Sequence, residues 1–141
     1  MRPIIGDREY FEGISKIKHE GKDTDNPLAY RFYDKNRVVA GKTMQEHFKF
    51  AVAYWHTLTG VGSDPFGIGT KTFPWLKQED PYKRATDKMD AAFEFITKLD
   101  LSYYCIHDVN LIDEGESIEE FSKRLDFITN KTKKKQDITG V

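Results

Sequence analysis

The sequence predicts an α/β fold built around a parallel sheet. Two short apolar segments, residues 50–57 and 103–107, have the composition of buried strands. Each is followed by a segment with helical periodicity, residues 82–99 and 118–135. The order strand, helix, strand, helix is typical of parallel α/β structure.

The composition is that of a polar globular domain. The chain has 141 residues, of which 32% are charged and 38% hydrophobic, enough for one domain of ordinary size. Its formal net charge of −1 gives no global attraction to nucleic acid or to an anionic membrane, and no apolar stretch approaches the length of a transmembrane helix. We therefore expect neither nucleic acid nor a membrane as a partner.

Cysteine usage and the N-terminus indicate the compartment. A single Cys excludes an internal disulfide and fits a reducing environment. Residues 1–13 lack the apolar centre of a secretory signal. We therefore expect a cytoplasmic protein.

Residues 1–42 have no regular pattern and are interpreted as an N-terminal arm. Charges and turn formers alternate there, but the aromatic side chains of Tyr30, Phe32 and Tyr33 favour an arm packed against another surface over a disordered tail. Thr43 and Glu46 have the spacing of a capping box, so a short helix is expected to begin at this point.

The segment 50–57 is followed by a long loop. Periodicity alone does not separate a buried strand from a buried helix here, and the aromatic and β-branched content favours a strand. Residues 60–81 hold four glycines and three prolines, which predicts irregular structure. Gly62 and Gly67 have the spacing of a phosphate loop, but residues 68–69 are Ile-Gly where Lys-Ser/Thr is required, which excludes that motif.

Three aromatic residues of this loop, Phe66, Phe73 and Trp75, allow two interpretations. They can fold back onto their own domain, or they can complete a pocket or an interface. The sequence leaves both open.

The second half of the chain predicts two amphipathic helices. Apolar residues recur at helical spacing over 82–99: Ala85, Met89, Ala92, Phe93, Ile96 and Leu99. Ser117 and Glu120 form a second capping box, and the following helix is expected to run to about residue 135. The basic run 131–135 is interpreted as the solvated last turns of that helix.

The last residues, 138–141, predict a helix stop at Gly140 and the start of a third strand. Two strands cannot form a stable parallel sheet, because such sheets are buried on both faces. The sequence therefore predicts that further strands complete the fold.

His107 is the candidate functional residue. It is the last residue of a predicted strand, and ligands of α/β proteins bind at the carboxyl ends of the strands. Tyr103 and Cys105 share its face by the period of two, and Cys105 is expected to be an inert core filler. A histidine with a purely structural role at a strand end is the alternative.

The chain resembles xylose isomerase, in the class with an N-terminal extension. The segments that carry the resemblance are YFEGISKIKHEGKDTDNPLAYRFYD, VVAGKTM, FAVAYWHTLTG, DPFG, GTKTFPW, DAAFEF and YYCIHDV, then EG and SIEE. It implies a (β/α)8 TIM barrel in a homotetramer that converts D-xylose to D-xylulose by a hydride shift, with two divalent cations, Mg²⁺, Mn²⁺ or Co²⁺. A full barrel needs about 250 residues. We therefore expect a partial barrel, in which residues 43–141 form the first two β/α units and residues 1–42 form the arm. As a truncated N-terminal fragment, the chain is expected to be inactive alone.

The resemblance also implies roles for four residues. His107 binds the sugar near its ring oxygen and assists ring opening, Trp55 walls the sugar pocket, and Phe66 reaches into the site of a neighbouring subunit. The family's aspartate that holds the histidine ring is Asn110 here. An Asn oxygen can accept a hydrogen bond from imidazole but brings no negative charge.

The family's metal ligands and catalytic lysine match no residue of this chain, so we expect no metal site in it. Two alternatives remain. One is another metal-dependent barrel of similar architecture, such as an abasic-site endonuclease-like protein. The other is a truncated product without enzymatic function.

Overall fold

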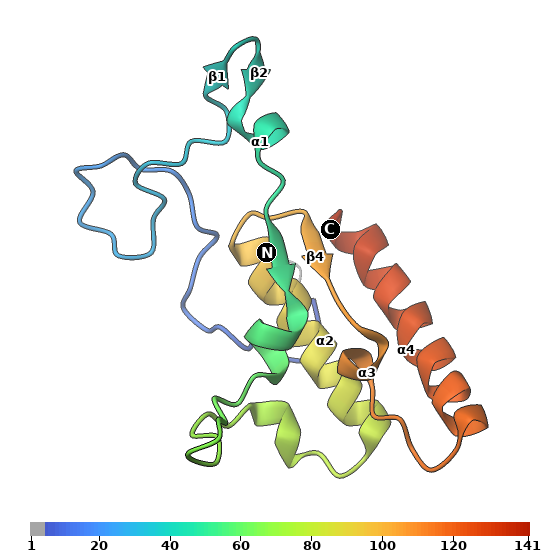
Figure 1. Ribbon diagram of the computed structural model, residues 1–141. Helices are drawn as coiled ribbons and strands as arrows, with labels where there is room; N and C mark the ends of the chain where they lie inside the picture. Colours follow the sequence, from blue (N-terminus) through green and yellow to red (C-terminus); the bar gives the residue numbers. More distant parts are fainter. Residues whose placement is uncertain (1–4) are drawn as a thin grey trace.

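The computed structural model describes residues 5–141 (Figure 1). The elements in chain order are β1 (Val38–Val39), β2 (Lys42–Thr43), α1 (Met44–His47), β3 (Ala51–Ala53), a π-helix (Trp55–Thr59), a 3₁₀-helix (Pro74–Lys77), α2 (Pro81–Lys98), β4 (Tyr103–Cys105), α3 (Asp108–Leu111) and α4 (Ile118–Thr139). Over residues 5–141, no helix combines the length and apolarity that crossing a membrane requires.

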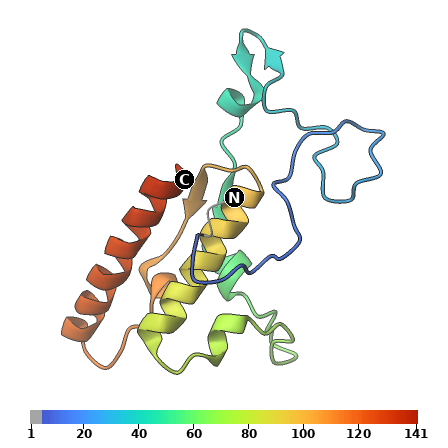
Figure 2. The ribbon, with the colours of Figure 1, turned by 180° about the vertical axis from the view of Figure 1, so that it is seen from behind.

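Strands β3 and β4 form a two-stranded parallel sheet, which confirms the predicted α/β class. Ala51 lies opposite Tyr103, and Ala53 lies opposite Cys105. Helices α2 and α4 pack against each other on the same side of this sheet, as the two opposite views show (Figures 1 and 2). The short β1–β2 hairpin, which the sequence did not predict, stands apart from this sheet.

Alternation along the strands gives the sheet one covered and one open face. Val52 is buried, and the Tyr104 ring meets the ring of Phe93 of α2 at 5.7 Å, so these residues face the helices. We call the opposite side, formed by Ala51, Ala53, Tyr103 and Cys105, the open face, because all of these but the half-buried Ala53 are exposed.

Strand β3 is shorter than predicted, because the chain turns into a π-helix after Tyr54. The predicted strand ran over 50–57, whereas β3 ends at Ala53. The backbone N–H of Gly60 donates to Trp55 O at 2.8 Å, the five-residue step of a π-helix. This turn places Tyr54 and Leu58 in one core cluster, each 2% exposed. An extended strand would leave the two side chains far apart along its length, so burial selects the helical turn.

Helix α2 confirms the predicted helix to within one residue at each end. Asp80 caps it by accepting the N–H of Tyr82 at 2.9 Å, and Pro81 occupies the first position, where its missing N–H costs nothing. The helix supplies residues to both core clusters, including Ala91 and Phe93. It is therefore the central support of the sheet.

Helix α4 begins where predicted and extends one turn beyond. Ser117 accepts the N–H of Glu120 at 3.1 Å, and the helix ends at Gly140 in the left-handed conformation with φ 74°. The basic run is therefore inside the helix rather than at its end. The interpretation as solvated side chains is wrong for Lys135, whose ammonium lies 2.7 Å from the carboxylate of buried Asp90.

The N-terminal arm packs against α2, as its aromatic content predicted. Glu94 of α2 accepts the backbone N–H of Tyr10 at 2.7 Å and of Phe11 at 2.9 Å. The Tyr30 hydroxyl donates to Leu99 O at 2.6 Å. Phe32 departs from this prediction, because its side chain is 82% exposed.

Candidate functional site

The carboxyl ends of β3 and β4 bring Trp55 and His107 together. Each residue lies two positions beyond the last paired residue of its strand, Ala53 or Cys105. Parallel strands end at the same edge of a sheet, so the two side chains emerge side by side. Their rings stack at 4.6 Å between centroids with an interplanar angle of 21°. We call them the Trp55–His107 pair.

The local backbone places both members of the pair at element boundaries. Trp55 opens the π-helix, a rare element that often occurs at functional sites. His107 is the N-cap residue of α3, a helix that the sequence did not predict, and its side chain is exposed. The exposed imidazole is therefore available to a ligand at this edge of the sheet.

His56 is a second exposed histidine next to Trp55, outside the Trp55–His107 pair, and the sequence analysis did not select it. Its ring lies 5.6 Å from that of Trp55 at a tilt of 52°. In the sequence, only its position next to Trp55 indicated that it would lie near this edge of the sheet. Because it is exposed like His107, it provides a matched control for experiments on that residue.

Asn110 lies one helical turn after His107, but its side chain makes no hydrogen bond with the His107 ring. The Asn110 backbone N–H donates to His107 O at 3.0 Å. Its side-chain oxygen is buried and has no hydrogen-bond partner within residues 5–141. A buried oxygen of this kind costs about 1–3 kcal/mol until it is paired, so a donor that reaches it would be bound favourably. The role of Asn110 stays a prediction.

Phe66 lies at the tip of the 60–70 loop, and its side chain is 97% exposed. The Asp64 carboxylate accepts the Phe66 N–H at 2.8 Å, and the backbones of Asp64 and Gly67 exchange hydrogen bonds of 3.2 and 3.3 Å. The tip therefore has a local turn of its own. In contrast, Phe73 and Trp75 fold back onto the domain, buried with their rings stacked at 4.7 Å.

Cys105, expected to be a core filler, is exposed on the open face. Its Sγ lies 3.8 Å from Val52 O. The strand alternation was predicted correctly, but the face that carries Cys105 has no covering layer within the described chain.

The residues described here do not form a metal site. Within residues 5–141, no group of three or more His, Cys, Asp or Glu side chains is placed to hold a metal ion. We therefore derive no chemical step through a metal held by these residues.

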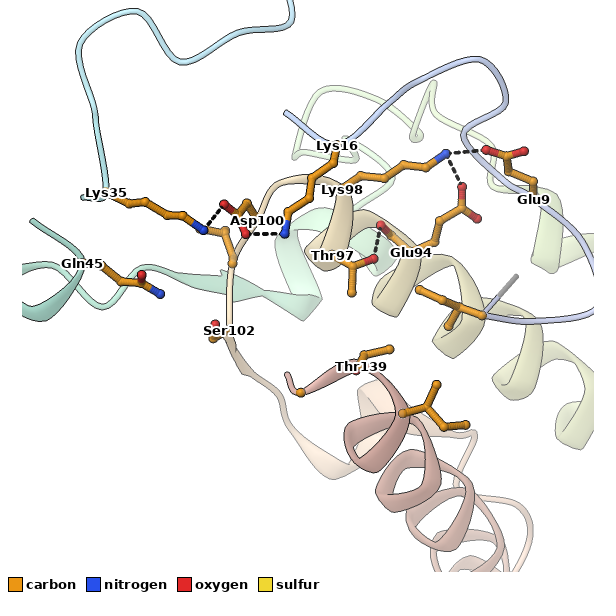
Figure 3. A pocket seen from close by; sticks show the side chains of 14 residues that line it. Glu9, Lys16, Lys35, Gln45, Glu94, Thr97, Lys98, Asp100, Ser102 and Thr139 are labelled. Atoms are coloured by element: carbon orange, nitrogen blue, oxygen red, sulfur yellow. Dashed lines mark hydrogen bonds and ion pairs between the residues drawn. The ribbon is translucent and has the colours of Figure 1, made fainter. Parts of the chain in front are cut away.

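A pocket of about 670 Å³ lies at the other end of the sheet (Figure 3). Asp100 and Ser102, which precede β4, line it, whereas His107 follows β4. Its charges are paired among themselves: Asp100 holds both Lys16 at 2.6 Å and Lys35 at 2.5 Å. Ligands of parallel α/β sheets bind at the carboxyl ends of the strands, so the Trp55–His107 pair is the stronger candidate.

Comparison with known proteins gives one consistent result. The chain is 52% identical over 138 residues to "Xylose isomerase 2" of Xanthomonas campestris pv. campestris, which covers 98% of this chain and 31% of that protein. It is 51% identical over 134 residues to the "Xylose isomerase" of Bacteroides thetaiotaomicron and 49% identical over 134 residues to that of Bacteroides fragilis, covering 95% of this chain in each case. The chain thus spans about a third of the length of these relatives. No family model matches it.

Proposed function

This chain is homologous to xylose isomerases over 98% of its length, and from this premise we propose that it supplies the ring-opening end of an aldose–ketose isomerase site. The reaction is the conversion of D-xylose to D-xylulose. The observation that carries the proposal is the stacked Trp55–His107 pair at the carboxyl ends of two neighbouring parallel strands.

The fold we propose for the complete protein is a (β/α)8 barrel, in which residues 43–141 form the first two β/α units and residues 1–42 the arm. Parallel pairing of β3 with β4 and helices on one face support it. In such a barrel the open face would line the interior, where the small side chains of Ala51 and Ala53 leave room for neighbours.

His107 is proposed to move one proton during ring opening. The neutral imidazole takes the proton of the anomeric hydroxyl while the bond between C1 and the ring oxygen breaks. The ring oxygen then receives a proton, which leaves an open-chain aldehyde and a neutral imidazole. Histidine suits this exchange because its ordinary pKa lies near neutrality.

Trp55 and Asn110 are proposed to orient the sugar and the imidazole. The indole offers a flat apolar wall to the C–H face of a sugar and, through the stack, restricts the tilt of the His107 ring. Asn110 can accept a hydrogen bond from the imidazole after a side-chain rotation, but it cannot neutralise an imidazolium. In the family that this chain resembles, two divalent cations promote the hydride shift that follows.

The partners we propose are D-xylose and three further copies of the complete protein. The support for an interface is Phe66, which is almost fully exposed on a shaped loop tip, together with Ile68, which is 91% exposed. Two neighbouring apolar side chains on one loop tip form a small exposed apolar surface of the kind that a protein contact buries. A cytoplasmic location, consistent with the single cysteine, remains part of the proposal.

The homologues favour this isomerase over the endonuclease-like alternative, because those compared above are named xylose isomerase. Within the proposal, the described residues alone are expected to show no turnover, since no metal site lies among them.

The proposal is tested by His107→Gln in a protein that joins this chain to the remaining two thirds of the relatives' length. With a single closed anomer of xylose as substrate, the rate should fall by about 10²–10⁴-fold, the usual contribution of acid–base assistance. An open-chain substrate should lose much less. The matched control is His56→Gln, also next to Trp55, which should leave both rates unchanged. Equal losses from both variants would refute the assignment of His107.

A further inference from the structure

We infer that Arg84 and Arg124 are positioning residues for His107, acting through Asp113. Asp113 lies at the far end of the segment that begins at His107 and contains α3. Its carboxylate accepts a hydrogen bond from Arg84 Nη2 at 2.6 Å, and its backbone oxygen accepts one from Arg124 Nη1 at 3.0 Å. We call this arrangement the Asp113 clamp.

Both arginines are held at a second point, so the clamp is stiff. Arg84 Nη1 donates to Gln78 O at 2.8 Å, and Arg124 Nη2 donates to Glu120 at 2.5 Å. The arginine side chains are 26% and 13% exposed. A partly buried guanidinium group that one partner already holds loses little entropy on binding a second. The clamp therefore joins α2 and α4 to the chain that follows α3.

The loop after Asp113 is shaped to pass close to Arg124. Gly115 has a positive φ of 83°, and a Cβ at this position would meet the Glu120 carboxylate at 2.7 Å and Arg124 Cζ at 3.1 Å. The Glu116 N–H donates to the same carboxylate at 2.9 Å. Only glycine permits this approach.

The segment from His107 to Asp113 needs such an anchor, because α3 is a single turn. Helices this short are not stable by themselves, and the N-cap His107 makes no side-chain capping bond. Leu111 and Ile112 are 8% and 1% exposed in the core cluster shared with α2 and α4. The segment is thus fixed at its carboxyl end by burial and by the clamp, while its amino end carries the exposed imidazole.

It follows that the clamp sets where the His107 ring lies relative to Trp55. His107 and Asp113 flank α3 on its two sides, so loosening the chain at Asp113 loosens this single turn and lets the imidazole leave the stack. An effect of the clamp on the reaction rate rests on the proposed function. Its effect on the position of the His107 ring does not.

The geometric consequence is tested in the complete protein by tryptophan fluorescence. Protonated imidazole stacked on indole quenches the indole emission. The part of the pH-dependent quenching that His107→Gln abolishes therefore reports the pair. Arg84→Met and Asp113→Asn should each remove most of that component. Lys83→Met is the control, because Lys83 on the same helix pairs with Asp7 and Asp87 but not with Asp113. Arg84→Lys should restore part of the component, since lysine can reach only one of the two partners.

An unchanged pH-dependent component in Arg84→Met and Asp113→Asn would overturn the inference. If Arg84→Met does not fold, Asp113→Asn decides, because it keeps the side-chain volume and the backbone bond to Arg124. In the complete protein, Arg84→Met should lower the closed-ring rate by up to about 10²-fold with little change in the affinity for sugar. Loss of the fluorescence component with an unchanged closed-ring rate would confirm the clamp and refute the proposed role of His107.

Discussion

Two polar side chains, one on α3 and one on α2, are buried without full compensation. One is the side-chain oxygen of Asn110, which has no partner within the described chain. The other is Lys88 on α2, a residue that is 8% exposed; its ammonium lies over the Tyr54 ring at 6.0 Å, and residues 5–141 provide no ion pair for it. A buried polar group costs stability unless it is paired with an opposite charge, a hydrogen-bond partner or a ligand. Single substitutions at Asn110 and Lys88 therefore test what each group contributes.

Asn110→Asp should raise the rate on closed xylose in the complete protein. A carboxylate one turn from His107 can both accept from the imidazole and stabilise the imidazolium that ring opening forms. We expect a gain of up to about tenfold, a fraction of the ~10²–10⁴ that acid–base assistance contributes. Pre-steady-state kinetics with a single anomer measures it, and an open-chain substrate serves as the control. An unchanged closed-ring rate would mean that orientation is all the histidine requires.

Lys88→Met should stabilise the protein at neutral pH. Burial lowers the pKa of Lys88 below its ordinary value of 10.5, with Asp113 opposing this shift and Arg84 adding to it. The charged form is therefore disfavoured in the folded state, and an apolar side chain of similar volume removes that cost. The expected gain in the free energy of unfolding is of the order of 1 kcal/mol, measured by denaturant titration. Lys77→Met, at an exposed position, should change little.

The pH dependence of this gain has a defined sign. Between the folded-state pKa of Lys88 and 10.5, the unfolded chain binds more protons, so the wild-type free energy of unfolding rises with pH. The advantage of Lys88→Met should therefore shrink as the pH approaches 10.5. If the stability gain of Lys88→Met grows between these pH values, the conclusion that burial lowers the pKa of Lys88 is wrong.

At the scale of elements, one buried carboxylate of α2 holds the part of the arm around Tyr10 and Phe11. Glu94 is 7% exposed, pairs with Lys98 at 2.8 Å and accepts the N–H groups of Tyr10 and Phe11. Burial opposes its ionisation, but the Lys98 hydrogen bond and the two backbone donors outweigh it and lower the pKa of Glu94 below the ordinary 4.5. The arm is therefore held by the ionised form of this residue.

Glu94→Gln should loosen the arm from α2 at Tyr10 and Phe11. An amide has one acceptor oxygen and turns its NH₂ toward a second donor, so we expect a loss of about 1–3 kcal/mol. Hydrogen exchange at the Tyr10 and Phe11 amides measures the local opening. Glu12→Gln, an exposed carboxylate on the arm itself, is the matched control. Full protection of both amides in Glu94→Gln would exclude Glu94 as the attachment.

Acid should loosen the arm in the same way. Because the folded-state pKa of Glu94 is depressed, its stabilisation is complete above pH 4.5 and is lost as the pH falls through the folded value. Asp100, with its pKa lowered by Lys16 and Lys35 against the effect of burial, contributes with the same sign. Asp90 has the opposite sign, because burial raises its pKa despite the contact with Lys135.

At the scale of the whole molecule, the open face determines how the chain behaves in solution. Phe48 and Phe50 beside it are each 49% exposed and Tyr103 is 46% exposed. Two paired strands of three residues also leave both sheet edges without a neighbour in the described part of the chain. Exposed apolar surface and open strand edges favour association with other chains.

We therefore expect the 141-residue chain by itself to self-associate or to be partly molten. Sedimentation should show a concentration-dependent mass, and near-UV circular dichroism should be weak relative to the helical far-UV signal. Tyr103→Lys on the open face should reduce association, whereas a lysine at exposed Ile118 of α4 should not. A sharp, cooperative melt of a monomer would show that the open face does not need a partner.

Helices α2 and α4 and the parallel arrangement were determined by the sequence, because caps and apolar periodicity act over neighbouring residues. Asp80 and Ser117 each cap the start of a helix by accepting a backbone N–H two or three residues ahead, wherever the rest of the chain lies. The resemblance to xylose isomerases was likewise present in the sequence, and the relatives at about 50% identity confirm it for this segment.

Tertiary structure decided the features that depend on contacts between distant residues. The turn after Tyr54 is helical rather than extended because Tyr54 and Leu58 are buried together against α2, a choice that an apolar segment does not make alone. The Trp55–His107 stack exists only because β3 and β4 pair in one particular register. The Arg84–Asp113 contact joins helix α2 to the loop after α3, two segments that no local pattern relates. Local hydrogen bonding and periodicity can be read along the chain, whereas register and burial are set by the whole fold.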